Sequence, residues 1–279
     1  MSNVLVTGCS SGFGHLTGLG FARQGHTVFA TMRDLAKAGP LQEAAEKEAL
    51  DLSVLQLDVT DPESVERAVK DAMATAGSLD ILVNNAGIEL RSSIEEASDD
   101  EILAQLDTNV LGLVRVTRAV LPAMREQRSG VIVNVSSIAG LVARPFGGFY
   151  SASKHAIEAI SEALHFELAE FGIRVAIVEP GQFATSLGDN ALVAKRFTEA
   201  SPYWGSSTRF DVAVRTLVPE GEPADPGVVA ETIIAVAEDP GAPLRHLLGA
   251  DAELIMSVRR AGDFESYEQT MRGALNWWD

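Results

Sequence analysis

The chain has 279 residues, of which 46% are hydrophobic and 22% are charged, so it has the composition of an ordinary globular protein rather than a disordered one. Its formal net charge of -17 argues against a nucleic-acid partner and against an anionic membrane surface, because both favour Lys and Arg. The single cysteine excludes an internal disulfide, and neither the cysteine count nor the spacing of the five histidines predicts a metal site.

Short apolar, β-branched runs alternate along the chain with segments of helical spacing. Near-continuous apolar strands are typical of a parallel sheet that helices cover on both faces. The alternation therefore predicts a doubly wound α/β fold with a seven-stranded parallel sheet. The predicted strands are residues 4–7, 27–31, 53–57, 81–84, 131–136, 175–178 and 245–248.

Capping residues mark several of the predicted helix ends. Asp61-Pro62 and Asp225-Pro226 each predict an N-cap carboxylate followed by a proline at the first helical position, where no N–H is needed. Gly172 lies where the helix before the sixth strand should end. No apolar run approaches the ~20 residues that span a bilayer. The first residues lack the cationic region of a signal peptide, so we expect a cytoplasmic protein.

Two segments near the end of the chain depart from this alternation. Residues 186–225 are interrupted by glycines and prolines, and a segment this long is uncommon unless it binds or covers a ligand. We therefore expect a substrate loop or lid within a single domain of residues 1–279, with a surface insertion carrying a short helix as the alternative. Residues 251–279 predict a C-terminal helical extension, in which Trp277 and Trp278 should pack on the core or on a partner subunit.

The first strand runs directly into a glycine-rich turn, which reads TGCSSGFG from residue 7 to residue 14. A turn of this kind before a helix presents backbone N–H groups and the positive end of the helix dipole to a pyrophosphate. Gly8 permits the tight turn, Gly12 lets the backbone approach the phosphates, and Gly14 lets the helix pack close to the strand. The turn predicts a dinucleotide site, although a purely structural strand-to-helix turn would also be glycine-rich.

Further motifs follow at the ends of successive strands: DV at 58–59, NNAG at 84–87, Ser137, and YSASK at 150–154. With the Gly-x-x-x-Gly-x-Gly spacing of the first turn, this order resembles the short-chain dehydrogenase/reductase family over nearly all of residues 3–250. Residues 30–34 and 178–181 look most like its hydroxysteroid- and retinol-dehydrogenase-like branch. The resemblance implies a single Rossmann-type domain with helices on both faces of the sheet. It also implies hydride transfer between a nicotinamide coenzyme and a carbonyl or alcohol.

The resemblance also assigns residues to the coenzyme. The first turn would bind the pyrophosphate, residues 58–59 would contact the adenine, and residues 85–87 would lie against the adenosine. The turn after the sixth strand would carry the chain beneath the nicotinamide, where Thr185 would bond the carboxamide. The residues expected to bind the coenzyme are Gly8, Ser10, Ser11, Gly12, Phe13, Gly14, Arg33, Asp58, Val59, Asn85, Ala86, Gly87, Tyr150, Lys154, Pro180, Gly181, Phe183 and Thr185.

The end of the second strand bears on the choice of coenzyme. A carboxylate at this point bonds the ribose 2′-hydroxyl of NAD and would repel the 2′-phosphate of NADP. Met32 occupies the acidic position here and Arg33 follows it, and a guanidinium matches a phosphate in charge and geometry. Ser11 could add a hydroxyl. We therefore expect NADP(H), and the alternative is NAD(H), with Arg33 in solvent and Asp34 on the ribose.

Tyr150 and Lys154 lie four residues apart in a segment of helical spacing, so they share one helix face. Reduction of a ketone puts negative charge on its oxygen, and the pKa of a free tyrosine, about 10, should be lowered by an adjacent ammonium. We expect Tyr150 to be the general acid and base, tuned by Lys154, which by the resemblance also holds the nicotinamide ribose. Ser137 would hydrogen-bond the substrate oxygen.

Asn109 is predicted to lie within an otherwise apolar helix, where an asparagine lowers helix propensity and therefore requires a reason. In the family that the chain resembles, this asparagine places a water in a proton relay to the lysine. We therefore expect Asn109 to be the fourth catalytic residue. The alternative is a buried asparagine that bonds only to backbone.

The substrate cleft is expected between residues 88–96, residues 138–149 and the loop from residue 186. Its apolar side chains favour a medium-sized apolar carbonyl or alcohol substrate. They are Leu141, Val142, Phe146, Phe149, Leu187, Tyr203, Trp204 and Phe210. By the family likeness, helices around 98–124 and 150–171 would form a homodimer or homotetramer interface.

Two other functional classes remain open on the sequence. An epimerase or dehydratase that keeps its nucleotide bound usually has a Gly-x-x-Gly-x-x-Gly first turn, which the sequence lacks. A nucleotide-sensing protein that has lost catalysis tends to lose the tyrosine or the lysine, and the chain retains both Tyr150 and Lys154.

Overall fold

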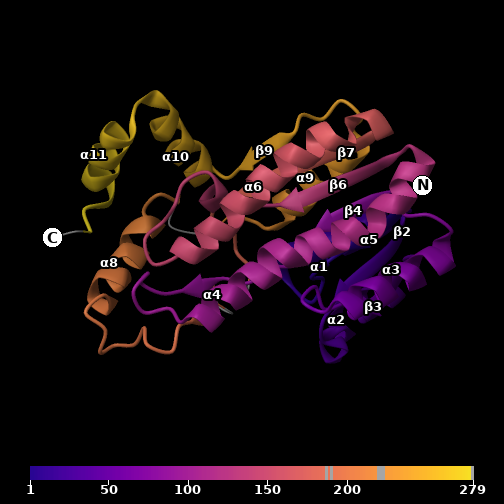
Figure 1. Ribbon diagram of the computed structural model, residues 1–279, viewed down its shortest axis with the longest axis horizontal. Helices are drawn as coiled ribbons and strands as arrows, with labels where there is room; N and C mark the ends of the chain where they lie inside the picture. Colours follow the sequence, from indigo (N-terminus) through magenta and orange to yellow (C-terminus); the bar gives the residue numbers. More distant parts are fainter. Residues whose placement is uncertain (186–187, 189–190, 219–223, 278–279) are drawn as a thin grey trace.

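The computed structural model describes residues 1–185, 188, 191–218 and 224–277. Within these residues, seven parallel strands form a central sheet in the order β3-β2-β1-β4-β6-β7-β9 (Figure 1). The predicted doubly wound fold is confirmed, and each strand begins and ends within two residues of its predicted bounds. The strands are β1 (Asn3–Val6), β2 (Thr27–Met32), β3 (Leu52–Gln56), β4 (Ile81–Asn84), β6 (Gly130–Val135), β7 (Ile173–Pro180) and β9 (Arg245–Leu248).

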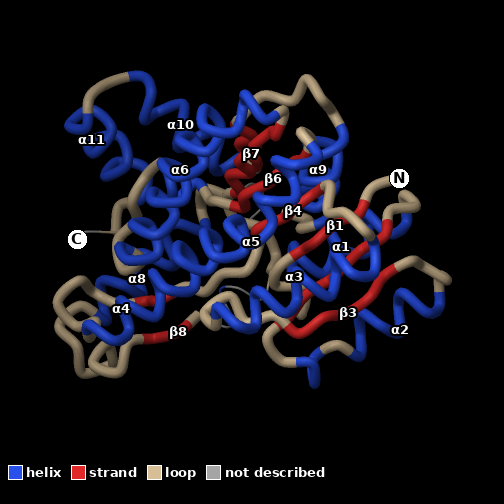
Figure 2. Tube along the Cα trace, turned by 45° about the vertical axis from the view of Figure 1, so that its right-hand side comes forward, coloured by secondary structure: helices blue, strands red, loops and turns tan. Residues whose placement is uncertain are grey.

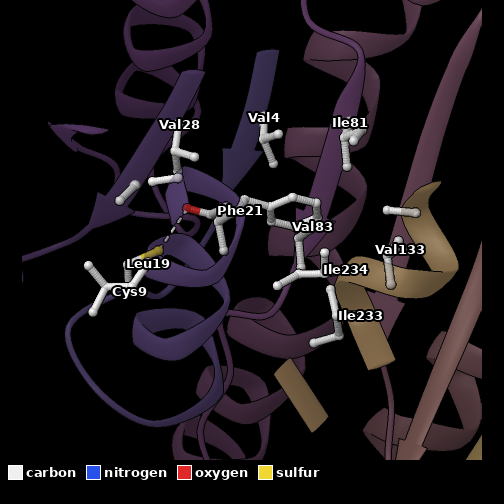
Figure 3. Packing of buried hydrophobic residues seen from close by; sticks show 14 of the residues in the cluster. Val4, Cys9, Leu19, Phe21, Val28, Ile81, Val83, Val133, Ile233 and Ile234 are labelled. Carbon is white, nitrogen blue, oxygen red and sulfur yellow. Dashed lines mark hydrogen bonds between the residues drawn. The ribbon is translucent and has the colours of Figure 1, made fainter. Parts of the chain in front are cut away.

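Helices cover both faces of this sheet, and Figure 2 shows the red strands running among the blue helices. In β1, Val4 and Val6 belong to one core and Leu5 to the other, because successive side chains of a strand point to opposite faces. Figure 3 shows the first core, where Phe21 and Ile234 lie against the apolar side chains of the sheet. The first face carries α1 (Gly12–Arg23), α2 (Gly39–Lys47) and α9 (Gly227–Glu238), and the second carries α3 (Pro62–Ala76), α5 (Gly112–Gln127) and α6 (Gly148–Leu168).

The helix ends follow the predicted caps with one shift. The Asp61 side chain accepts a backbone N–H two residues further on, and Pro62 is the first residue of α3, as predicted. Before α9, the Asp225 side chain also accepts an N–H two residues on, but the helix begins after Pro226, so the predicted start is one residue early. Gly172 has a φ of 69° at the end of α6 and its following turn, a conformation that glycine adopts at little cost.

Three further helices, α8, α10 and α11, lie together at one end of the molecule. There α11 contacts α8 and α10 (Figure 1). Irregular structure was predicted for residues 186–225, and this is wrong for Trp204–Arg215, which form the helix α8. This part of the chain lacks proline, and it buries Phe210 and Ala213 on one helix face. The remaining elements used below are α4 (Asp99–Leu106), the π-helical turn η2 (Asp107–Leu111), the 3-10 turn η3 (Ile138–Gly140), the short parallel pair β5 (Leu90–Arg91) and β8 (Leu192–Val193), α8 (Trp204–Arg215), α10 (Ala250–Ala261) and α11 (Phe264–Leu275).

An aromatic cluster joins α8 to the end of the chain. Phe146, Phe210 and Trp277 pack together with ring centroids 5.2 to 6.3 Å apart. Trp277 therefore packs on the core of its own chain, which is one of the two outcomes expected for it. Leu187 and Trp278 lie outside the described residues, as do the other undescribed positions of the predicted lid, 186, 189, 190 and 219–223. Among the described helices, none combines the length and the apolar character needed to cross a bilayer.

Candidate active site

The glycine-rich first turn packs tightly against the turn that follows β4. Gly8 has a φ of 75°, and a Cβ atom built on it would lie 2.8 Å from the Cα atom of Ala86. A Cβ atom on Gly14 would lie 2.5 Å from the carbonyl oxygen of Gly8, so neither position accommodates a side chain. Thr7, to which the sequence assigned no role, joins the two turns. Its Oγ1 atom accepts the backbone N–H groups of Asn85 and Ala86 at 2.9 and 3.0 Å.

The start of α1 faces the residues that follow β7. A Cβ atom on Gly12 would lie 3.6 Å from the Cβ atom of Thr185, and the rings of Phe13 and Phe183 meet edge to face with centroids 6.0 Å apart. Ser11 precedes the helix, and its side chain makes no capping hydrogen bond to the helix. The structure thus brings the expected pyrophosphate and nicotinamide residues together. Uncapped N–H groups at the positive end of a helix fit the pyrophosphate of a dinucleotide.

At the end of β2, Arg33 is free to contact a ligand, whereas Met32 and Asp34 are engaged within the protein. Met32 is buried in the core, with 2% of its surface exposed. Arg33 is exposed at the edge of the sheet where Ser10 is also exposed. The Asp34 carboxylate accepts the backbone N–H of Ala36 at 3.0 Å and so caps the turn that follows. The Asp34 carboxylate is therefore already used as a cap for the neighbouring backbone, and this argues against the alternative that it binds a ribose hydroxyl.

Asp58 and Val59 follow β3 in a rigid turn. The Asp58 carboxylate accepts the backbone N–H and the hydroxyl of Thr60 at 2.9 and 2.7 Å. Val59 is buried against Gly112 of α5, where an added Cβ atom would lie 2.7 Å from the valine side chain. The turn is therefore fixed at the edge of the sheet where the family resemblance expects the adenine.

Tyr150, Lys154 and Ser137 meet near the carboxyl ends of β6 and β7. Tyr150 and Lys154 lie one turn apart on α6, and the Lys154 Nζ atom is 5.7 Å from the centroid of the Tyr150 ring. This Nζ atom donates a hydrogen bond of 2.8 Å to the carbonyl oxygen of Val135, the last residue of β6. The Ser137 hydroxyl lies within hydrogen-bonding reach of Tyr150 and donates to the carbonyl oxygen of Pro180 at 3.3 Å.

Burial governs the ionisation of these groups. It raises the pKa of Tyr150 above the usual range, whereas the Ser137 hydroxyl and the Arg144 guanidinium act to lower it. The expectation that Lys154 gives Tyr150 a low pKa is therefore wrong for this arrangement, because the loss of water outweighs the neighbouring charges. Burial also lowers the pKa of Lys154 to about 8, against the opposing charge of Glu158. At neutral pH the site thus holds a protonated phenol beside an ammonium.

Asn109 lies in the π-helical turn η2, where the sequence predicted regular helix. Its Oδ1 atom accepts the backbone N–H of Ile88 at 2.8 Å, and its Nδ2 atom donates to the carbonyl oxygen of the same residue at 2.9 Å. Nδ2 also donates to the Ser153 hydroxyl at 3.0 Å, and Ser153 donates to the carbonyl oxygen of Tyr150 at 2.7 Å. The alternative that Asn109 bonds only to backbone is therefore wrong, because its side chain also bonds to Ser153 of α6. Gly87 lies beside it, since an added Cβ atom would be 3.4 Å from Oδ1.

A cavity of about 910 Å³ opens beside the tyrosine. On one side it is lined by Ser137, Tyr150, Gly181, Phe183 and Thr185. On the other side, α8, α10, α11 and the end of the chain supply mostly apolar side chains: Phe210, Val214, Ile255, Phe264, Tyr267, Met271, Leu275 and Trp277. The same elements also contribute the charged residues Arg215, Asp251, Glu268 and Arg272. The C-terminal helices were not expected in the cleft, because nothing in their local sequence pattern indicates where they dock.

The apolar side chains expected in the cleft divide into two groups. Val142 and Phe210 line the cavity, whereas Leu141 does not. Phe146, Phe149, Tyr203 and Trp204 pack instead into a neighbouring cluster around the buried ring of Phe197. Large aromatic side chains of one loop region bury more surface against each other than against an open cavity, which accounts for the difference.

A charged cluster that the sequence did not predict lies near Lys154. Glu158 of α6 and Glu179 of β7 are buried, and Arg245 of β9 donates to both carboxylates at 2.5 Å. Arg245 also pairs with the more exposed Glu162 at 2.6 Å. Burial and the charge of Glu158 raise the pKa of Glu179 to about 7, and Arg245 opposes this shift. The members are far apart in the sequence, so no local motif could reveal the cluster.

The fold and the site define a dinucleotide-binding oxidoreductase of the α/β class, with a glycine-rich turn at the carboxyl edge of the sheet. The chain belongs to the short-chain dehydrogenase family, whose model matches residues 2–195. The family expected from the sequence motifs is thereby confirmed.

Known relatives agree with this assignment. A 3-ketodihydrosphingosine reductase of Bacteroides thetaiotaomicron is 39% identical over 206 residues, which are 74% of this chain and 73% of that protein. Estradiol 17-beta-dehydrogenase 1 of Rattus norvegicus is 36% identical over 258 residues, covering 87% of this chain and 72% of that protein.

Solved structures show the same fold. A crystal structure of a short-chain dehydrogenase from Streptomyces avermitilis is 36% identical, with a TM-score of 0.78 over 98% of this chain and 99% of that one. The structure of ElxO with NADP bound is 28% identical, with a TM-score of 0.74 over 89% of this chain and 96% of that one. The expected single Rossmann-type fold is therefore confirmed.

Proposed function

We propose that this protein is an NADP(H)-dependent oxidoreductase that interconverts a carbonyl compound and a secondary alcohol, with Tyr150 as the general acid and base. One observation carries the proposal: Tyr150 and Ser137 line a cavity that also borders the Gly181 turn, and the Lys154 Nζ atom lies 5.7 Å from the centroid of the Tyr150 ring. When bound, the nicotinamide supplies the hydride in reduction and accepts it in oxidation. In reduction, Tyr150 gives its proton to the carbonyl oxygen while the hydride reaches the carbonyl carbon. Ser137 donates a hydrogen bond to that oxygen.

The ionisation of the site favours reduction at neutral pH. Because the pKa of Tyr150 is raised by burial, the phenol holds the proton that the product alcohol requires. The Lys154 ammonium stabilises the phenolate that remains after the transfer. Asn109, through Ser153, would order a water on the path that returns a proton toward Lys154, as in the family that the chain resembles.

Arg33 supports NADP(H) rather than NAD(H). Its guanidinium is exposed at the end of β2, the carboxylate of Asp34 caps its own turn, and Met32 is buried. The similarity to ElxO, whose structure contains NADP, points to the same coenzyme. Ser10 and Ser11 would add hydrogen bonds from the first turn.

The cavity wall favours an apolar substrate. The side chains that α8 and α11 contribute to the cavity are mostly apolar, and two relatives are named for a ketodihydrosphingosine and for estradiol. We assign residues 186–225 to the substrate loop and residues 251–279 to a C-terminal extension, whose described part supplies one wall of the cavity.

We further infer a cytoplasmic homodimer or homotetramer. The single cysteine, Cys9, is unpaired and buried, as is usual in a reducing compartment. Leu103, Leu111 and Phe166 are exposed apolar side chains on α4, η2 and α6, the helices that the family likeness assigns to the subunit interface.

The test is NADPH oxidation, followed at 340 nm, across a panel of ketones. We expect turnover by the native protein and a loss of at least about 100-fold in kcat for Tyr150→Phe, since a positioned general acid contributes roughly that much. NADPH affinity, measured by fluorescence titration, should change little in the variant. Nucleotide binding without turnover of any ketone or alcohol would support the alternative of a catalytically silent sensor, and equal turnover by Tyr150→Phe would refute the assignment.

A further inference from the structure

An ion pair lies inside the cavity, close to the catalytic tyrosine. Arg144, in the loop between η3 and α6, donates through Nη2 to the Oε1 atom of Glu89, which immediately precedes β5. Both side chains line the cavity. The guanidinium carbon of Arg144 is 6.0 Å from the centroid of the Tyr150 ring. The pair therefore borders the position at which the reactive carbonyl would lie.

The backbone beside Arg144 is strained and is fixed by its surroundings. Phe146 has a φ of 58°, in the left-handed region that bulky residues seldom adopt. Its ring packs against Phe197, Phe210 and Trp277 with centroid separations of 6.0 to 6.3 Å. Strain of this kind persists only where the packing over-determines the conformation, and it is concentrated at functional sites. The aromatic cluster thus holds the loop that positions Arg144.

The ion pair is costly for the fold. The Glu89 side chain is 9% exposed and the Arg144 side chain is 38% exposed, so the cost falls mainly on the carboxylate, which has lost most of its water. The attraction between the two charges repays such a loss of solvation only in part. Arg144 also keeps its Nε atom buried without a hydrogen-bond partner, which adds to the cost. A few polar groups in an otherwise apolar cavity typically fix the orientation of a ligand. The pair is therefore better explained by recognition than by stability.

The chemistry of the pair limits what it can bind. Arg144 offers N–H donors and Glu89 offers carboxylate oxygens, and together they carry no net charge. A carboxylate ligand would be repelled by Glu89, and an ammonium ligand would be repelled by Arg144. A hydroxyl group carries no charge and both donates and accepts a hydrogen bond, so it can satisfy both partners.

We propose that Arg144 and Glu89 form a specificity-determining subsite that binds a hydroxyl group next to the reactive carbonyl. The preferred substrate is then a hydroxyketone whose apolar chain lies along α8 and α11. This inference rests on the proposed function and names the substrate class of that site.

The test compares 1-hydroxy-2-dodecanone with 2-dodecanone, which differ only in the hydroxyl group. We expect the native protein to prefer the hydroxyketone by about 10- to 100-fold in kcat/KM with NADPH, as a hydrogen bond to a charged group provides. The double variant Arg144→Leu/Glu89→Leu removes both charges together and so leaves no unpaired buried ion. Its preference should fall to near 1. Arg23→Leu/Glu48→Leu is the matched control, because it also removes an ion pair, and neither residue lines the cavity.

Calorimetric titration of both ketones, with and without NADP⁺, gives the same comparison without turnover. A hydroxyketone preference that Arg144→Leu/Glu89→Leu loses and Arg23→Leu/Glu48→Leu keeps would support the subsite. Equal kcat/KM values and equal affinities for the two ketones in the native protein, or an unchanged preference in Arg144→Leu/Glu89→Leu, would overturn it. Tight selective binding of the hydroxyketone without NADPH oxidation would instead contradict the proposed function and leave the subsite supported.

Discussion

Asp251, in the first C-terminal helix, accepts a hydrogen bond of 2.9 Å from the backbone N–H of Gln182. Its carboxylate also fills the space beside Gly181, where an added Cβ atom would lie 2.2 Å from an Asp251 oxygen. Asp251 is buried, with 3% of its surface exposed. The C-terminal extension is therefore bound directly to the turn that would pass beneath the nicotinamide.

Asp251→Ala should weaken both stability and substrate binding. The variant leaves the Gln182 N–H buried without a partner, at a cost of about 1–3 kcal/mol, which lowers Tm by several degrees in a chain of this size. We also expect a higher KM for the ketone, since α10 and α11 line the cavity. Thermal denaturation and steady-state kinetics measure the two effects. Asp251→Asn keeps an acceptor oxygen and should lose less, so equal losses in both variants would contradict the role assigned to the hydrogen bond.

The pH dependence of ketone reduction should report on Lys154. Burial lowers the pKa of Lys154 to about 8, so its ammonium is present below that pH and is lost above it. We predict that kcat/KM falls as the pH rises through about 8. Glu158 acts to raise this pKa, so Glu158→Gln should move the fall to lower pH. Glu162→Gln, at an exposed position of the same helix, should leave the profile in place. A profile unchanged by Glu158→Gln would rule out the coupling.

Arg33 should determine the coenzyme preference. Removal of a guanidinium that binds the 2′-phosphate is expected to reduce kcat/KM for NADPH by about 10- to 100-fold. The same change should affect NADH much less, because NADH has no 2′-phosphate. The ratio of kcat/KM for the two coenzymes in Arg33→Ala checks this, with Lys37→Ala as a control for the loss of an exposed charge nearby. A native protein that prefers NADH would contradict the prediction at the outset.

Gly14 should tolerate no side chain. In Gly14→Ala the new methyl group would lie 2.5 Å from the backbone of Gly8 and from the Asn85 amide, so the first turn must shift. We expect lower thermal stability and at least about a 10-fold loss of NADPH affinity, since one misplaced hydrogen bond to a charged group is enough for that loss. Gly39→Ala is the matched control, because no atom lies within 4 Å of its added Cβ. Native affinity in Gly14→Ala would show that the close packing of the turn does not matter.

The exposed apolar side chains on η2 and α6 should matter for assembly. Leu111→Asp or Phe166→Asp places a charge on a surface that the proposed interface would bury, so either change should shift the protein toward monomer. Sedimentation velocity over a range of concentrations measures the shift. Leu254→Asp, on α10 and about as exposed as Leu111, should leave the oligomeric state unchanged. A native protein that is monomeric at all concentrations would contradict the proposed interface.

Much of the frame could be predicted because its signals are local. The β-branched runs predicted every strand of the central sheet, and Asp61-Pro62 predicted the start of α3. The order of the first turn, Ser137, Tyr150 and Lys154 predicted which side chains would meet, because parallel strands bring their carboxyl ends to one edge. Each strand, cap and motif can be recognised from a few consecutive residues.

The sequence by itself thus determined the fold class and the family, and it named the residues that we propose for the catalytic centre. Only the tertiary structure decided the surroundings: the π-helical turn at Asn109, the C-terminal wall of the cavity, and the pairing of Arg144 with Glu89. It also reversed the expected direction for the pKa of Tyr150. These properties depend on burial and on contacts between distant segments, and neither is encoded in the short-range pattern of a chain.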